Sequence, residues 1–324
     1  MRKNPTPNLQ SIKDFFREIM PYLENKPIIR EIKSGPVLYV GDLHGFYQNL
    51  LDAFDVAKLK EVHAVVFLGD YADRGPSQLR TLVKVMDAFA RSEGYTKKGT
   101  LQNYVPEENF PFKIIALRGN HEDTEVNARY GFKEELRYTH EFLEFPHEIL
   151  DQLYSNLPIF SSTKWKTLGV HGGIPKPRKG AKVSKLPRYL IKKRTPLTIN
   201  VDDSFSKDLM VEIYQTLWND PNLGNDAPQP DFRMSFRGPN IYEYNKTALE
   251  IFLEKNGCRR LVRAHEVTEK GFEIHWNNKL VHIFSASPYF ARVKTAAYFL
   301  EREDSTGEII DDKGKCLKKV DLPI

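Results

Sequence analysis

The sequence predicts an α/β fold in which helices alternate with the strands of an at least partly parallel sheet. Three short runs rich in Val, Ile and Leu, at residues 37–40, 64–68 and 113–117, are typical of buried strands. The segments between them, near 46–58 and 77–91, place apolar residues at helical spacing. This β-α-β-α-β order predicts parallel strands, and α/β proteins place their active sites at the carboxyl ends of such strands.

A packing helix is expected at residues 8–24, ahead of the first strand. Ser11 and Asp14 form a capping signature. One face of this helix collects Ile12, Phe15, Phe16 and Ile19. In the second helix, near 46–58, the residues expected to face inward are Leu50, Leu51 and Phe54.

The later segments differ in character. Residues 92–111 contain Gly, Pro, Asn and charged residues, and we expect them to form a surface excursion. Two apolar or alternating runs surround Asn277 and Asn278, which predicts a hairpin. Strands should dominate the C-terminal third.

The length of 324 residues allows one large domain or two average ones. We expect a single soluble domain over residues 1–324, with a core at 36–300 and a tail at 301–324. The apolar fraction is 40%, and no apolar run approaches the roughly 20 residues that span a bilayer. The N-terminus lacks a secretory signal, and Cys258 and Cys316 have no CxxC neighbour. A reduced, cytoplasmic location with no membrane partner is therefore expected.

The charge is uneven along the chain. The formal net charge is only +5, but nine Lys or Arg and no acidic residue lie between Lys176 and Arg194. Such a run is usually a solvated insertion loop. The alternative is a docking segment for an acidic peptide, a nucleic acid or another phosphorylated partner, and of these nucleic acid is the least expected.

Polar residues follow five of the apolar runs, which is unusual because a buried strand normally stops in neutral turn formers. The set contains two carboxylates, one amide and three imidazoles: Asp42, His44, Asp70, Asn120, His171 and His265. Six oxygen and nitrogen ligands without a thiolate exceed what one tetrahedral zinc site needs. They suit two divalent ions, with Mn, Fe or Zn favoured over Ca.

Five motifs carry a resemblance to a known family. "GDLHG", "GDYADRG", "RGNHE", "HGG" and "RAHE" resemble, in order and approximate spacing, the phosphoprotein phosphatase (PPP) family of serine/threonine phosphatases. This family lies within the calcineurin-like metallophosphoesterase superfamily, and the resemblance covers about residues 36–289. It implies a calcineurin-like metallophosphoesterase fold, a central β-sandwich of two mixed sheets flanked by helices.

The resemblance also implies a role for each ligand. Asp70 would bridge two ions, and the other ligands would divide between them: Asp42 and His44 on the first, and Asn120, His171 and His265 on the second. His121 matches the general acid of the family, and Asp73 matches the carboxylate that orients it.

Arginines that grip phosphate are implied as well. Arg74 is the firmer match, while Arg118 lies where the family has a site-flanking arginine. The second phosphate arginine is either Arg233 or Arg237, and the Arg-Gly step favours Arg237. Tyr289 would line the substrate site opposite the metals, and Asn120 would also face the substrate.

The resemblance therefore implies a metal-dependent protein serine/threonine phosphatase that acts on phosphorylated proteins or peptides. Two metals can lower the pKa of a bridging water so that the resulting hydroxide attacks phosphorus directly. Two alternatives remain: a nucleotide hydrolase acting on diadenosine polyphosphates, and a non-catalytic phosphopeptide or nucleic-acid binding protein. The remaining histidines are expected to be structural: His63, His140, His147, His275 and His282.

Overall fold

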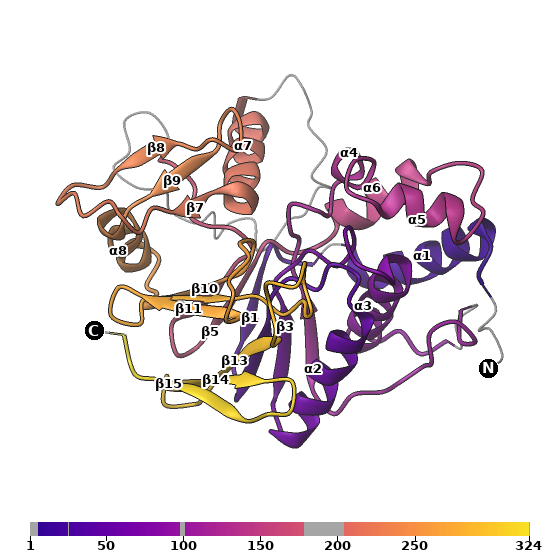
Figure 1. Ribbon diagram of the computed structural model, residues 1–324, viewed down its shortest axis with the longest axis horizontal. Helices are drawn as coiled ribbons and strands as arrows, with labels where there is room; N and C mark the ends of the chain where they lie inside the picture. Colours follow the sequence, from indigo (N-terminus) through magenta and orange to yellow (C-terminus); the bar gives the residue numbers. More distant parts are fainter. Residues whose placement is uncertain (1–5, 25, 98–100, 178–203, 324) are drawn as a thin grey trace.

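The fold is a sandwich of two six-stranded sheets with helices on its outer faces (Figure 1). The computed structural model describes residues 6–24, 26–97, 101–177 and 204–323. Both sheets contain parallel and antiparallel pairs, so the predicted sandwich of two mixed sheets is confirmed.

The first sheet has the strand order β15-β14-β13-β2-β3-β4. Its strands are β2 (Val37–Val40), β3 (Ala64–Phe67), β4 (Lys113–Ala116), β13 (Ala297–Glu301), β14 (Gly307–Asp311) and β15 (Cys316–Val320). β2, β3 and β4 are parallel and in register, as the alternation of strands and helices predicted. β13, β14 and β15 pair antiparallel, so the stretch expected as a tail, 301–324, supplies strands to the sheet.

The second sheet has the order β1-β5-β6-β10-β12-β11. Its strands are β1 (Ile29–Ile32), β5 (Phe160–Thr163), β6 (Thr167–Gly169), β10 (Arg260–Arg263), β11 (Phe272–His275) and β12 (Leu280–Ile283). β11 and β12 form the predicted hairpin, and its turn residues Asn277 and Asn278 have φ of 55° and 65°. Asparagine tolerates this left-handed conformation better than most residues.

Three apolar layers hold the sheets and helices together. One layer lies between the two sheets, with Val66 and Val262 as members from opposite sides. A second packs the first sheet against α1 (Leu9–Leu23), α2 (Tyr47–Leu59), α3 (Gln78–Ser92), α5 (Phe132–Tyr138) and α6 (His147–Ser155). A third packs the second sheet against α7 (Ser204–Trp218) and α8 (Lys246–Lys255). Figure 1 shows these two groups of helices on opposite sides of the strands.

Two shorter elements complete the architecture. α4 (Thr124–Asn127) follows β4, and a small sheet of order β7-β9-β8 adjoins α7. Its strands are β7 (Asp220–Pro221), β8 (Phe232–Met234) and β9 (Tyr242–Tyr244). This small sheet brings the residues after α7 toward the ends of the main strands (Figure 1).

Some sequence expectations differ from the structure. The first helix begins at Leu9 and its cap is Asn8, whose side chain accepts from the Ser11 amide at 2.8 Å, so the Ser11 cap was wrong. Asn8 takes that position because its extended backbone lets the side chain reach back to the free amides of the first turn. In α2, Leu50 and Phe54 are buried as expected, but Leu51 is only half-buried.

The stretch 92–111 also departs from expectation. Ser92 ends α3, and the described residues 93–97 and 101–111 are irregular. Tyr95, Leu101 and Val105 are nevertheless buried in the helix-side layer, so the stretch is more than a surface excursion. In the basic run, only Lys176 and Pro177 are described; the rest lies outside the described residues. Across the described ranges, every helix is too short or too polar to cross a bilayer.

Candidate metal centre

The predicted ligands converge because the strands that precede them end at one edge of the sandwich. Asp42 follows β2, Asp70 follows β3 and Asn120 follows β4, and these three strands are parallel and in register. His171 follows β6 and His265 follows β10, which run parallel in the second sheet. The amide of His265 donates to Asp42 Oδ1 at 3.0 Å, which joins the two sheets at this edge.

Five residues of the site have a left-handed backbone. The φ angles are 43° at His44, 58° at Asp70, 67° at Asp73, 69° at Arg74 and 75° at His265. This region costs a residue with a side chain of the order of 1 kcal/mol or more, and such residues concentrate at functional sites. The conformation turns each side chain sharply away from its strand and toward the others.

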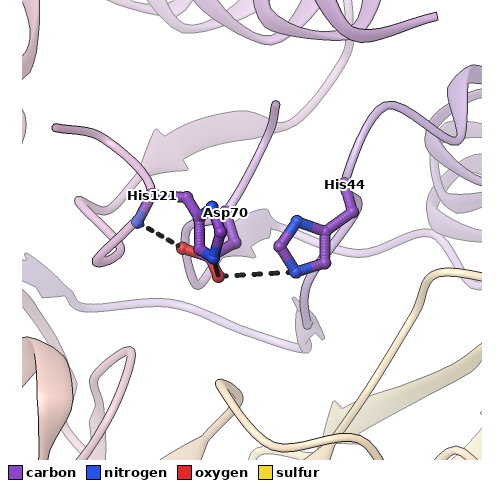
Figure 2. Close-up of side chains that lie close together, drawn as sticks. All are labelled: His44, Asp70 and His121. Carbon is purple, nitrogen blue, oxygen red and sulfur yellow. Dashed lines mark hydrogen bonds and ion pairs between the residues drawn. The ribbon is translucent and has the colours of Figure 1, made fainter. Parts of the chain in front are cut away.

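Asp70 lies at the centre of the cluster. Its Oδ2 is 3.6 Å from His44 Nε2 and 3.9 Å from His121 Nε2, and Figure 2 shows the imidazole of His44 directed at this carboxylate. Its Oδ1 accepts from the His121 amide at 3.0 Å and lies 3.3 Å from His171 Nε2. The Asp70 carboxylate therefore belongs to two groups of potential metal ligands. The first group is His44, Asp70 and His121, and the second is Asp70, His171 and His265.

The tautomers of two imidazoles follow from their backbone partners. His44 Nδ1 lies 3.0 Å from the carbonyl oxygen of Ala72, and His171 Nδ1 lies 2.9 Å from that of Leu68. A carbonyl oxygen can only accept, so each Nδ1 carries the proton and donates it. Each Nε2 is then left with a free lone pair directed at Asp70, the arrangement that metal-ligating histidines commonly use.

The second group of ligands is more compact. Asn120 Oδ1 lies 2.8 Å from His171 Nε2 and 2.8 Å from His265 Nδ1, and these two nitrogens are 3.2 Å apart. Oxygen and nitrogen atoms this close can share a small cation. The chemistry of the donors, imidazole with carboxylate and amide oxygen, suits a divalent transition metal.

Burial of these groups is consistent with bound cations. Asp42 Oδ2 and His265 Nε2 are buried and find no hydrogen-bond partner within the described residues. Burial raises the pKa of Asp42 to about 7 and raises that of Asp70 well above its usual range. Burial also lowers the pKa of His44, His171 and His265, which keeps them in the neutral form that binds metals. The residues present therefore fit a pair of divalent ions.

Glu122 organises the turn beneath Asp70, and sequence reasoning gave it no role. Its carboxylate accepts from the amides of Asp70 at 2.8 Å, Tyr71 at 2.9 Å and Gly119 at 2.7 Å. Gly119 is required here because a Cβ would lie 2.3 Å from Asp70 Oδ1. Burial raises the pKa of Glu122 to about 7, while the three amide donors oppose that shift. The signal in the sequence that could have identified Glu122 is its position in the motif "RGNHE".

His121 and Asp73 form a hydrogen-bonded pair beside the cluster. His121 Nδ1 lies 2.6 Å from Asp73 Oδ2. Asp73 also accepts from Asn127 Nδ2 at 2.8 Å and from the amide of Phe132 at 3.1 Å. Burial lowers the pKa of His121, and the positive charge of nearby Arg74 lowers it further. Asn127 lies in the segment "NARYGF", and sequence reasoning gave it no role.

Arg74 links this pair to Tyr289. Its Nη2 lies 3.3 Å from His121 Nε2, and its Nη1 donates to the Tyr289 hydroxyl at 2.6 Å. The ring of Tyr289 stacks on that of His44, with 5.6 Å between centroids and 22° between planes. Tyr289 therefore lies beside one of the candidate metal ligands, whereas we expected it opposite them.

The two candidate arginines of the C-terminal half are in different places. Arg237 Nε donates to Asp220 Oδ2 at 2.5 Å, and Asp220 Oδ1 lies 3.8 Å from His265 Nε2. The positive charge of Arg237 contributes to lowering the pKa of His265. Arg233 instead pairs with Asp231, and its side chain is 61% exposed. The structure thus brings Arg237 to the cluster and leaves Arg233 outside it.

Two further charged residues hold this region. Asp220, in "LWNDP", also accepts from Arg263 Nη2 at 2.8 Å, and sequence reasoning gave neither residue a role. Arg118 Nε donates to the carbonyl oxygen of Glu122 at 3.1 Å. Arg118 therefore supports the turn that carries Asn120 and His121.

A family model described as calcineurin-like phosphoesterase matches residues 35–269. The chain belongs to the calcineurin-like phosphoesterases. The matched region contains all six candidate ligands and the pair of His121 and Asp73. Membership of this family implies divalent metal ions at the cluster.

Curated relatives carry the names of serine/threonine phosphatases. The chain is 25% identical to the PP2A-like phosphatase PPG1 of Candida albicans over 90% of its own length and 61% of that protein. It is 29% identical to the phosphatase rdgC of Drosophila melanogaster over 85% of its own length and 39% of that protein. The chain thus spans between 39% and 61% of the length of these relatives. The resemblance drawn from the motifs is confirmed.

Solved structures agree on the fold. A serine/threonine phosphatase from Saccharomyces cerevisiae, similar to human PP5, superposes with a TM-score of 0.64 at 20% identity over 90% of this chain and 82% of that one. A cold-active protein-tyrosine phosphatase from a psychrophilic Shewanella superposes with a TM-score of 0.55 at 16% identity over 93% of this chain and 84% of that one. Both share the fold of this chain, and the family model identifies that fold as the calcineurin-like one that the resemblance implied.

Proposed function

We propose that this protein is a metal-dependent phosphatase that hydrolyses phosphoserine and phosphothreonine in proteins or peptides. The observation that carries the proposal is the position of Asp70, whose two oxygens face two groups of histidines next to the pair of His121 and Asp73. The relatives named as serine/threonine phosphatases support phosphoprotein substrates over the nucleotide alternative.

Two divalent ions, of Mn, Fe or Zn, are proposed at the cluster. Asp70 would contact both ions, and the remaining ligands would be Asp42 and His44 for one and Asn120, His171 and His265 for the other. When bound, such ions lower the pKa of a water molecule toward neutrality and stabilise the negative charge of a phosphoryl group in transfer. The role of Glu122 is to hold the backbone of Asp70 so that both carboxylate oxygens stay in position.

Arg74 and Arg237 are proposed to grip the phosphate. Their guanidinium groups lie near opposite members of the cluster, Arg74 beside His121 and Arg237 beside the Asp220 that faces His265. Planar guanidinium groups bind phosphate oxygens in pairs, which lysine cannot copy. Tyr289 holds Arg74 through its hydroxyl and so positions one of these grips, and Asn120 would face the substrate as well as the metals.

His121 is proposed to donate a proton to the leaving serine or threonine oxygen. In the present arrangement its Nδ1–H is donated to Asp73, and its Nε2 faces Arg74. The pKa of His121 is low because the group is buried beside cationic arginines. A phosphate dianion bound between those arginines would cancel their charge and raise that pKa, so that substrate binding itself would favour the acid form.

The test compares two leaving groups. His121→Asn should slow a phosphothreonine peptide by roughly 100-fold or more, because an alkoxide needs a proton to leave. It should slow p-nitrophenyl phosphate far less, since nitrophenolate is stable without one. The exposed His147 provides the matched control, and His147→Asn should leave both rates unchanged. Equal slowing of both substrates would remove His121 from the acid role, and inactivity of the unaltered protein across several metals would end the proposal.

A further inference from the structure

A second charged pocket lies at the edge of the sandwich away from the metal centre. It has a volume of roughly 530 Å³, and Arg30, His63 and Lys113 are among its lining residues. Lys113 is the first residue of β4, and His63 immediately precedes β3, so the pocket is at the amino ends of the parallel strands. Four residues of a strand span about 13 Å, which separates the pocket from ligands beyond the carboxyl ends.

The walls of this pocket carry more positive than negative charge. Its cations are Lys26, Arg30, Lys33 and Lys113, and its carboxylates are Glu31 and Glu93. Glu93 is already engaged, because its carboxylate pairs with Arg30 and with Lys26 Nζ at 2.8 Å. Among the described residues, Lys113 and Lys33 have no ion pair. Two cationic side chains thus face the pocket without a counter-charge.

The buried part of the pocket shows the same shortage of negative charge. The side chain of Arg30 is only 7% exposed and lies over the ring of Phe89, 5.9 Å from its centroid. Its Nη1 is buried and finds no acceptor in the described parts of the chain. Burial lowers the pKa of Lys113, and Arg30 and Lys26 lower it further against the opposing effect of Glu93. A buried charge normally has acceptors for each donor, so these groups favour an incoming anion.

The pocket also has an apolar side. Pro27, Ile29 and Ile32 belong to its lining. Its volume falls within the roughly 300–1,000 Å³ typical of sites for small organic molecules. A bare ion would leave most of that space and the apolar wall unused.

We propose that this pocket binds a small organic phosphate, with the dianionic head near Lys113 and Lys26 and the carbon portion against Pro27 and Ile29. Lys113, Lys26 and Arg30 share the single carboxylate of Glu93, so this part of the pocket has two positive charges in excess, which match the two charges of a phosphate monoester. The site is independent of the proposed phosphatase activity, because it uses different residues at the opposite ends of the strands.

Phenylphosphonate is the probe for this site, since its carbon–phosphorus bond is not cleaved by hydrolysis of a phosphate ester. Titration of the metal-loaded protein, followed by amide NMR, separates the two sites. The amides of His63 and Lys113 report on the pocket, and those of Asp70 and Asn120 report on the metal centre. We expect the pocket amides to shift with a midpoint of their own, and inorganic phosphate to bind there more weakly than phenylphosphonate.

Three single-charge variants test the assignment. Lys113→Gln should weaken binding in the pocket by about tenfold, the loss expected for one hydrogen bond to a charged group. Glu31→Gln should tighten it by about twofold or more, because it removes an exposed competing carboxylate. Lys318→Gln removes an exposed lysine on β15 and should leave the pocket midpoint unchanged.

Three results would overturn the proposal. The first is an absence of shifts at the pocket amides, or shifts whose midpoint equals that of the metal centre. The second is an equal loss of affinity in Lys113→Gln and Lys318→Gln, which would mean that net charge alone attracts the probe. The third is binding of inorganic phosphate as tight as that of phenylphosphonate, which would remove the organic part of the ligand.

Discussion

Asp73→Asn is the sharpest test of the pair that we assign to proton transfer. The change keeps the shape of the side chain and removes its charge and one acceptor oxygen. In the native protein, Asp73 accepts three hydrogen bonds, from His121 Nδ1, Asn127 Nδ2 and the amide of Phe132. An asparagine has one oxygen and one NH2 group in place of the two oxygens. Its NH2 group must therefore face either the amide of Phe132 or the two donors His121 Nδ1 and Asn127 Nδ2, and a donor then faces a donor.

The magnitude follows from that count. At least one buried donor loses its acceptor, which costs about 1–3 kcal/mol, and the charge-assisted bond to His121 is lost as well. We therefore expect the free energy of unfolding to fall by about 2–4 kcal/mol. If the new NH2 group faces His121, Nδ1 must be the acceptor and the proton moves to Nε2, so the doubly protonated imidazolium that serves as the acid is disfavoured. Loss of acid catalysis is typically worth about 100- to 10,000-fold in rate.

The assay measures kcat for a phosphothreonine peptide and for p-nitrophenyl phosphate across pH, together with urea unfolding. We expect a loss of at least about 100-fold with the peptide, a much smaller loss with p-nitrophenyl phosphate, and disappearance of the limb of the peptide pH profile that reports the acid. Tyr154→Phe is the control, because Tyr154 donates to the other side of Asn127 at 2.9 Å and never touches Asp73. A native pH profile in Asp73→Asn, or a native stability, would refute the reasoning.

Four other outcomes are expected. Arg237→Lys should raise KM for p-nitrophenyl phosphate by about tenfold or more, while Arg233→Lys should leave it unchanged. Equal effects of the two changes would show that Arg237 is not the second phosphate-binding arginine. Glu122→Gln should lower the free energy of unfolding by about 1–3 kcal/mol, since one buried amide loses its acceptor, whereas the exposed Glu125→Gln should not. Chelation should lower the melting temperature and added Mn should restore it, because metal binding stabilises the folded state; an unchanged melting temperature would argue against bound ions. Burial raises the pKa of Glu301 above 4.5, so the folded state holds this proton to higher pH than the unfolded state. The free energy of unfolding should therefore fall as pH rises from about 4.5. Glu301→Gln should remove that fall in urea unfolding measured across pH.

The convergence of the candidate ligands was predictable from the sequence because these residues are tied to local pattern. A polar residue that follows a buried strand lies at the edge of the sheet where that strand ends. Parallel strands bring their carboxyl ends to the same edge, so such residues lie close together. Asp42, Asp70, Asn120, His171 and His265 all follow that rule. The hairpin at Asn277 was equally local, because two asparagines between strand-like runs define the turn.

Features that depend on long-range packing were not predictable. Glu122, Asn127 and Asp220 hold their neighbours through hydrogen bonds to residues that are distant in sequence or to backbone amides, and no periodicity marks such partners. The order of the second sheet joins β1 to β5 and β6 to β10, pairings set by burial rather than by propensity. The buried Leu101 lies in a segment whose composition is that of a loop, so only the structure identifies it as part of the core.

The five left-handed residues at the centre have a consequence for how this protein can change. Glycine adopts that backbone freely, so Arg74→Gly would relieve local strain even as it removes a side chain that the site needs, whereas Asp73→Gly would leave three donors without their acceptor. Selection for heat resistance alone should therefore favour glycine at position 74, and the variants that survive longest on heating would be among those that turn over the least substrate.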